Sequence, residues 1–217
     1  MTYYVLIAPF VTGLFVLSTV LIATTTRLPS LVRYYRISCW SLGILCLAIA
    51  YGEGSTHLVP VAVAIITIKG LMVPYVISHF ARRTAGSLRL LSTFRPTPMW
   101  FFSVLAISGA SFLAIQSPFI AVAGESYLLP ISISTVFIGL IIMMTRRDVL
   151  SQMVGFLVME NGITLFSISA IGGISVIIEA GIYSVVLIGA VLMASLSSQV
   201  QELYGSSDTS QLTELID

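Results

Sequence analysis

The sequence predicts an all-α fold, a polytopic membrane bundle of about seven transmembrane helices with the N-terminus outside and the C-terminus cytoplasmic. Three observations support it. Of the 217 residues, 57% are hydrophobic and only 9% are charged, whereas soluble domains carry about 25% charged residues. The apolar residues form stretches close to the ~20 residues that a helix needs to cross a bilayer core. The arginines fall between these stretches.

The expected helices follow the apolar stretches in order. They cover residues 4–24, 37–52, 58–80, 98–119, 127–145, 149–171 and 174–199. The first stretch has no basic segment before it and no small-residue cleavage site after it, so we expect a membrane span rather than a signal peptide. Two prolines and an aromatic cluster open the fourth. The apolar tract from 149 to 199 is too long for one span, and we divide it at Gly172-Gly173.

The nine arginines predict the orientation. They occur only after the first, third and fifth helices: Arg27, Arg33 and Arg36; Arg82, Arg83, Arg89 and Arg95; Arg146 and Arg147. The alternate loops hold Glu53, His57 and Glu125, and no arginine or lysine. Positive residues accumulate in cytoplasmic loops. The arginine-bearing loops are therefore expected in the cytoplasm.

The composition argues against several classes of function. No basic run suggests a nucleic-acid partner. Cys39 and Cys46 lie in one apolar segment without metal-ligand spacing, so we expect buried thiols. Two histidines are too few and too scattered for a haem or metal site on this chain alone. The expected surroundings are the lipid bilayer, and we expect no cofactor on this chain.

Lys69 is the first candidate site residue. It lies about 16 Å from the cytoplasmic end of its predicted helix, close to mid-membrane. A charge there costs about 2.5 to 3.5 kcal/mol on insertion scales. Gly70 and Pro74 follow it, and because proline has no N–H, the Gly70 carbonyl loses its usual partner and the helix is weakened. Lys69 is either part of an ion relay or a structural lysine paired with a neighbouring carboxylate.

Glu160 is the second candidate. It lies about 18 Å from Asp148 along its helix and hence at a depth similar to Lys69. A part-polar face surrounds it: Phe156, Leu157, Thr164 and Ser167. Small residues on a different face favour close helix packing: Ser151, Gly155, Gly162 and Ser169. Glu160 is either an ion-relay group or a neutral acid hydrogen-bonded to Asn161 or to another helix.

Two further residues are secondary relay candidates. Glu179 lies about five residues into the last predicted helix, near the outer surface, where it either exchanges ions with water or is simply a solvated interfacial glutamate. His79 lies at the cytoplasmic end of the third helix, ten residues after Lys69 and about 80° around the helix axis. We interpret it as an interfacial histidine rather than a partner of Lys69.

Several segments together resemble the membrane component E of hydrogenase-4-type, energy-converting complexes. They are ITIKGLMVP around Lys69, RRD followed by QMVGFLVMENG around Glu160, IIEAGI around Glu179, and SSDTSQLTELID at the end. The last three helices are also similar to the K subunit of respiratory complex I and the C subunit of cation/proton antiporters. Leu157 matches the K subunit's first membrane glutamate, one turn before Glu160. The second membrane glutamate of the K subunit has no clear counterpart in this sequence. The resemblance leaves Lys69 to supply the second ionisable group in its place.

The resemblance implies a division of the chain into residues 1–126, a four-helix membrane part; 127–199, the K-like part; and 200–217, an acidic cytoplasmic tail. It implies a non-catalytic subunit of a complex I-like, redox-driven complex in the prokaryotic inner membrane, which moves protons or sodium ions. Antiporter-like membrane subunits and peripheral redox subunits would be its partners. A nickel-iron centre and iron–sulfur clusters would lie on those partners.

Other interpretations stay open at the level of sequence. The chain could serve a cation/proton antiporter without redox chemistry, since the K-like helices fit both. A self-contained transporter would commonly show internal repeats, and no convincing repeat is present. A scaffold that only packs against partners would need neither Lys69 nor Glu160 for ion movement.

Overall fold

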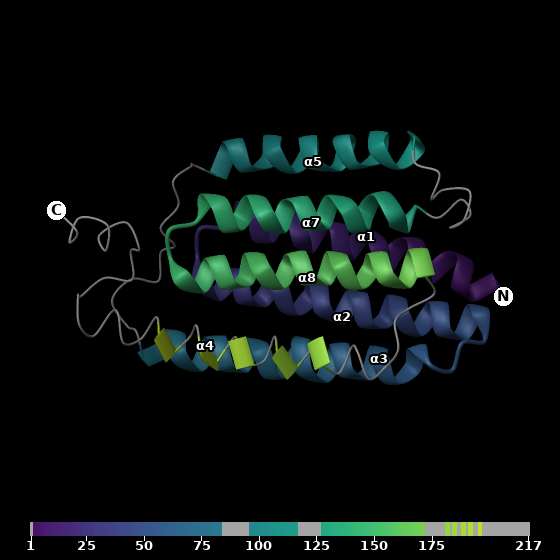
Figure 1. Ribbon diagram of the computed structural model, residues 1–217, viewed down its shortest axis with the longest axis horizontal. Coiled ribbons are helices and arrows are strands. Elements are labelled where there is room, and N and C mark those ends of the chain that lie inside the picture. Colours follow the sequence, from purple (N-terminus) through teal and green to yellow (C-terminus); the bar gives the residue numbers. More distant parts are fainter. Residues whose placement is uncertain are drawn as a thin grey trace.

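The computed structural model describes residues 2–83, 96–116 and 127–171, with short stretches between 181 and 196. Within these ranges every regular element is a helix (Figure 1). In chain order they are α1 (Thr2–Thr24), α2 (Leu28–Glu53), α3 (Leu58–Ala64), η1 (Ile65–Met72), α4 (Val73–Arg83), α5 (Pro96–Gln116), α7 (Leu128–Thr145) and α8 (Val149–Ile171). Here η1 is a π-helix that joins α3 to α4 in one continuous rod.

Five of these helical segments are long and apolar enough to cross a membrane: Ile7–Thr24, Leu28–Gly52, Leu58–His79, Leu128–Thr145 and Val149–Ser169. A shorter apolar segment, Met99–Leu113, lies in α5. The prediction of an all-helical, multi-pass membrane protein is thus confirmed in the described ranges. The predicted last helix, 174–199, lies largely outside them and the tail, 200–217, wholly so. The count of seven and the orientation stay predictions.

The predicted start of the second helix was wrong. We expected residue 37, but α2 begins at Leu28, with a proline in its first turn where the missing N–H has no cost. Arg33 and Arg36 therefore lie on the helix and not in a loop, and both side chains are exposed. Long basic side chains can extend along a helix toward water, so a span can carry them near its end.

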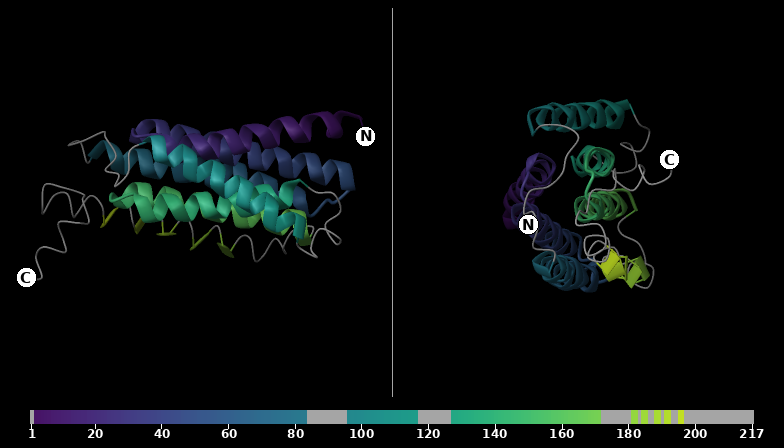
Figure 2. Two further views of the ribbon diagram at one scale, coloured as in Figure 1. Left: turned by 90° about the horizontal axis from the view of Figure 1, so that it is seen from above. Right: turned by 90° about the vertical axis from the view of Figure 1, so that its left-hand side faces the viewer.

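The helices form a layered bundle. The α7–α8 hairpin lies at the centre, with α5 against α7 on one side and α2 against α8 on the other (Figure 2). Helix α1 packs along α2, and the α3–η1–α4 rod packs on the remaining side of α2. This order places α2 between the rod that contains Lys69 and the helix that contains Glu160.

Glycines allow α7 and α8 to approach closely. A Cβ at Gly155 would lie 2.9 Å from the Met143 nitrogen, and one at Gly162 would lie 2.8 Å from the Val136 nitrogen. Real Cβ atoms do not tolerate such distances to backbone. Both glycines belong to the predicted small-residue stripe of α8, so this part of the prediction is confirmed.

The arginines at the ends of the described helices lie at one end of the bundle, which we call the arginine end, and Arg33 and Arg36 lie within the first nine residues of α2 from that end. Arg27 precedes α2, Arg82 and Arg83 end α4, and the Arg146-Arg147 pair joins α7 to α8 (Figure 1). The cytoplasmic position that the charge rule gives this end stays a prediction. Side chains buried near it form one apolar cluster, which includes Leu28 and Leu31.

Arg146 fixes the end of α1. Its Nη2 donates to the carbonyl oxygens of Ala23 at 2.9 Å and Thr25 at 2.6 Å, which are among the carbonyls that a helix end leaves unsatisfied. Asp148 precedes α8 and caps it, because its Oδ2 accepts a hydrogen bond from the Ser151 N–H at 2.8 Å. Burial lowers the pKa of Arg146 and raises that of Asp148, and their mutual attraction opposes both changes.

Candidate ion-relay site

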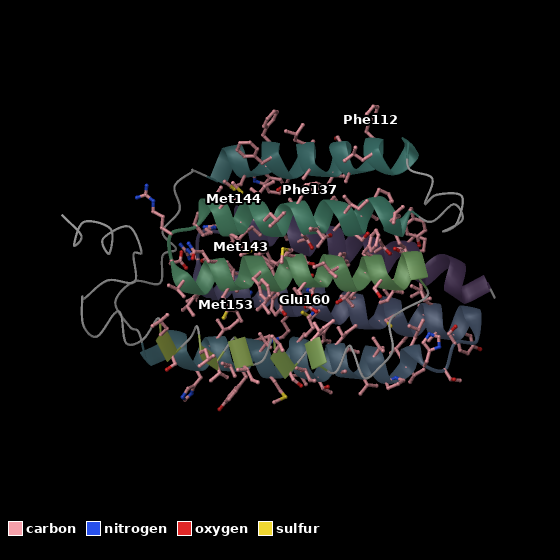
Figure 3. The ribbon with its side chains drawn as sticks, viewed as in Figure 1. Phe112, Phe137, Met143, Met144, Met153 and Glu160 are labelled. Atoms are coloured by element: carbon pink, nitrogen blue, oxygen red, sulfur yellow. The ribbon has the colours of Figure 1, made fainter. Side chains whose placement is uncertain are left out.

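Lys69 and Glu160 meet inside the bundle. The Lys69 Nζ and the Glu160 Oε2 form an ion pair, and the side chains are 0% and 7% exposed. Figure 3 shows Glu160 on the side of α8 that faces α2. Lys69 and Glu160 are 91 residues apart in the chain, so their contact depends on how the helices of the bundle pack together. The sequence placed them at similar depth but could not show that they touch.

The pair lies halfway along its helices. Glu160 is eleven residues from Val149 and eleven from Ile171, the two ends of α8. At 1.5 Å per residue it is therefore about 16 Å from either end. Lys69 is eleven residues from Leu58, at the start of α3. Both charges thus lie near the middle of a membrane-crossing segment, as far from bulk water as the bundle allows.

The backbone around Lys69 departs from α-helix. Lys69 and Gly70 lie in η1, and such π-turns are frequently found at functional sites. The Gly70 carbonyl accepts a hydrogen bond from Trp40 Nε1 of α2 at 3.4 Å. A Cβ at Gly70 would lie 2.7 Å from the Trp40 ring, so glycine permits this approach. From Pro74 we predicted that the Gly70 carbonyl lacks its usual helical partner, and the Trp40 indole N–H supplies one.

The second carboxylate oxygen of Glu160 also has a partner. The Thr164 hydroxyl lies 3.3 Å from Glu160 Oε1 and 3.0 Å from the Glu160 backbone oxygen. Of the face predicted around Glu160, Leu157, Thr164 and Ser167 are buried, whereas Phe156 is 39% exposed. The two polar side chains predicted to share a face with Glu160, Thr164 and Ser167, are thus buried as Glu160 is.

Asn161 connects the site to α2. Its Nδ2 donates to the Cys39 Sγ at 3.5 Å, so the amide hydrogen bond that the structure gives it leads away from Glu160. Tyr35 lies one turn before Cys39 on α2 and is also fully buried. Both cysteines are buried, as predicted, and neither forms a disulfide. The polar partner of Cys39 was not predicted, because its place in an apolar segment gave no sign of it.

Of the two secondary candidates, only His79 lies in the described ranges, and it does not join this site. His79 is exposed and stacks against Tyr75, with ring centroids 6.2 Å apart. Glu179 lies outside the described residues. Across the described ranges, no three His, Cys, Asp or Glu side chains gather as a metal site would require.

Known proteins show distant similarity to the chain. An uncharacterized protein of Mycobacterium tuberculosis is 24% identical over 214 residues, which covers 98% of this chain and 97% of that protein. Hydrogenase-4 component E of Escherichia coli K12 is 23% identical over 147 residues, 68% of each chain, and the Shigella flexneri protein gives the same values. No family model and no solved structure matches.

The similarity to hydrogenase-4 component E agrees with the resemblance drawn from the motifs around Lys69 and Glu160. This similarity covers about two thirds of the chain. It is too distant to show more than that the chain comes from a family related to hydrogenase-4 component E. The similarity of the last three helices to the K subunit of complex I stays a prediction.

Proposed function

We propose that this chain is a non-catalytic membrane subunit of a complex I-like, redox-driven complex of the nickel-iron hydrogenase type, and that the Lys69–Glu160 pair takes part in ion translocation. The buried ion pair at mid-helix is the observation that supports this role best. Similarity to hydrogenase-4 component E supports the kind of complex.

The energetics of the pair favour a working role over a structural one. Replacing a buried ion pair by well-packed apolar side chains is often neutral or stabilising by about 1 to 4 kcal/mol. A bundle that needed only stability would therefore gain little from two charges at this depth. Lys69 and Glu160 are both buried and contact each other directly. Such a pair is suited to open and close as charge arrives from neighbouring groups.

The mechanism follows from the charge balance of the pair. When closed, the ammonium and carboxylate neutralise each other in the low-dielectric interior. A proton taken up by Glu160, or a charge brought close to Lys69, removes that balance and releases the two side chains. The π-turn gives the Lys69 backbone an alternative to regular helix, so the released side chain can change its direction.

The other parts of the machine would lie on partners. Peripheral redox subunits would hold the nickel-iron centre and the iron–sulfur clusters, and antiporter-like membrane subunits would continue the ion path. The arginine end would face the cytoplasm of a prokaryotic cell, with the complex in the inner membrane. Residues 127–199 would form the K-like part, and Glu179 and His79 would lie near the outer and the cytoplasmic surface of the membrane, respectively.

The test begins with the native complex. A tagged chain is isolated from its own membranes and the co-purifying subunits are identified. Nickel-iron hydrogenase subunits and antiporter-like subunits are the expected result. Antiporter subunits alone, without any redox subunit, would favour the alternative of a cation/proton antiporter.

The second step tests the pair. Glu160→Gln in the purified complex is expected to leave electron transfer working while ion pumping falls sharply. Thr67→Val is the matched control. Thr67 is exposed on η1, the π-helix that contains Lys69, and its hydroxyl donates only to backbone carbonyls of α3. Normal pumping by both Glu160→Gln and Lys69→Met would leave a scaffold role.

A further inference from the structure

A stripe of buried polar side chains on α2 leads away from the ion pair. Tyr35, Ser38 and Cys39 are 0%, 1% and 0% exposed. Their spacing of three and four residues places them on one face of the helix. Cys39 is eleven residues from Leu28, at about the middle of α2, and Tyr35 is seven, about 10 Å from the arginine end. The stripe therefore covers part of the distance from mid-membrane to that end.

One hydrogen bond connects this stripe to the residue beside the pair. Asn161, the residue after Glu160, donates from its Nδ2 to the Cys39 Sγ at 3.5 Å, and Tyr35 lies one turn before Cys39 on the same face of α2. The surrounding side chains are apolar, and Leu28, Leu31 and Val32 fill the last two turns before the arginine end. Buried polar side chains thus extend from Asn161, beside Glu160, to Tyr35, and the apolar side chains between Tyr35 and the arginine end form what we call the apolar plug.

Two atoms of these polar side chains have no protein partner among the residues described. They are the Ser38 Oγ and the Asn161 Oδ1, and both are fully buried. A buried polar atom without a hydrogen bond costs about 1 to 3 kcal/mol. Ordered water commonly satisfies such atoms. Hydroxyl, thiol and water can each accept a proton on one side and donate one on the other, which is what a proton path requires.

The same geometry argues against a metal cation as the transported ion. Hard cations need several oxygen ligands around one point. Of the Glu160 oxygens, Oε2 faces the Lys69 ammonium and Oε1 faces the Thr164 hydroxyl. The group that Asn161 contacts on α2 is the Cys39 thiol, a soft ligand that a hard cation does not favour.

We propose that Tyr35, Cys39 and Asn161 form the arginine-end branch of a proton path to the Lys69–Glu160 pair, so that the coupling ion is a proton. This inference rests on the proposed function, because it requires that the pair handles ions. Protons would pass along the branch when the apolar plug at Leu31 admits water.

The experiment compares the two buried cysteines of α2. The purified native complex, with Cys39→Ala or Cys46→Ala, is reconstituted in liposomes, and electron transfer is started from outside. Proton movement is followed with a pH-sensitive dye and sodium movement with a radioactive tracer. Cys46 is the matched control, since it is equally buried, lies two turns along the same helix, and donates from its Sγ to the Leu58 carbonyl of α3 at 3.5 Å.

We expect proton movement without sodium movement, slowed several-fold by Cys39→Ala and by Tyr35→Phe and unchanged by Cys46→Ala. Cys39→Ser, which keeps a donor and an acceptor, should restore most of the rate. Equal rates for Cys39→Ala and Cys46→Ala, with Glu160→Gln still blocking pumping, would refute the branch and leave the proposed function standing. Sodium transport would refute the proton assignment. If Glu160→Gln also pumps normally, the proposed function itself is wrong.

Discussion

Removing one partner of the buried pair should cost far more stability than removing both. Glu160→Gln leaves the Lys69 ammonium at 0% exposure with no opposite charge. Breaking a buried pair in this way destabilises proteins by about 3 to 5 kcal/mol. Lys69→Met leaves the carboxylate in the same position. The double variant Lys69→Met/Glu160→Gln has no charge to strand, so its stability should lie within about 1 to 2 kcal/mol of the parent protein.

The assay is a double-mutant cycle on the purified chain in mild detergent, with the free energy of unfolding measured for the four proteins. The coupling energy should be a large fraction of each single effect, because the two side chains interact directly. Thr67→Val, on the same π-helix, should change stability little. Two single variants as stable as the parent, or effects that simply add, would contradict the ion pair.

Three further perturbations test other parts of the structure. Gly155→Ala should destabilise the protein by about 1 to 3 kcal/mol, because the added methyl group overpacks against α7. Gly13→Ala is the control and should not destabilise it, since nothing lies within 4 Å of a Cβ at that position. Equal melting temperatures for the two variants would contradict the close approach of α7 and α8. Trp40→Phe should lose about 0.5 to 1.5 kcal/mol with its interhelical hydrogen bond, and Trp100→Phe should lose less in the same unfolding assay. Burial raises the pKa of Asp148 in the folded state, so folding stability should fall as pH rises from the ordinary aspartate value of about 3.9 toward the folded one. Asp148→Asn should flatten the dependence of folding stability on pH, measured from unfolding curves at several pH values. An unchanged slope would contradict the raised pKa of Asp148.

Much of the bundle could be predicted because hydrocarbon imposes simple rules. Helix length, depth and the small residues at Gly155 and Gly162 follow directly from the order of the side chains. The start of α2 could not be read in this way. Arg33 and Arg36 suggest a loop by their charge, yet as exposed residues near a helix end they can reach water without interrupting the helix.

The site was predictable in its two charges and not in its connections. The depth of Lys69 and Glu160 follows from counting residues along each helix. Their contact, the Trp40 bond to Gly70 and the Asn161 bond to Cys39 depend on which faces of three helices meet. A single sequence shows which residues share a face of each helix, but not which faces of different helices pack together. Trp40 and Cys39 therefore gave no sign of a role.

The most direct test of the account is the number of ions moved per electron by the native complex with Lys69→Met/Glu160→Gln. This variant keeps the interior free of an unpaired charge, so loss of pumping cannot be ascribed to misfolding. The account predicts normal electron transfer with a ratio of ions to electrons well below that of the parent complex. An unchanged ratio would show that the charges of Lys69 and Glu160 are not needed to move ions.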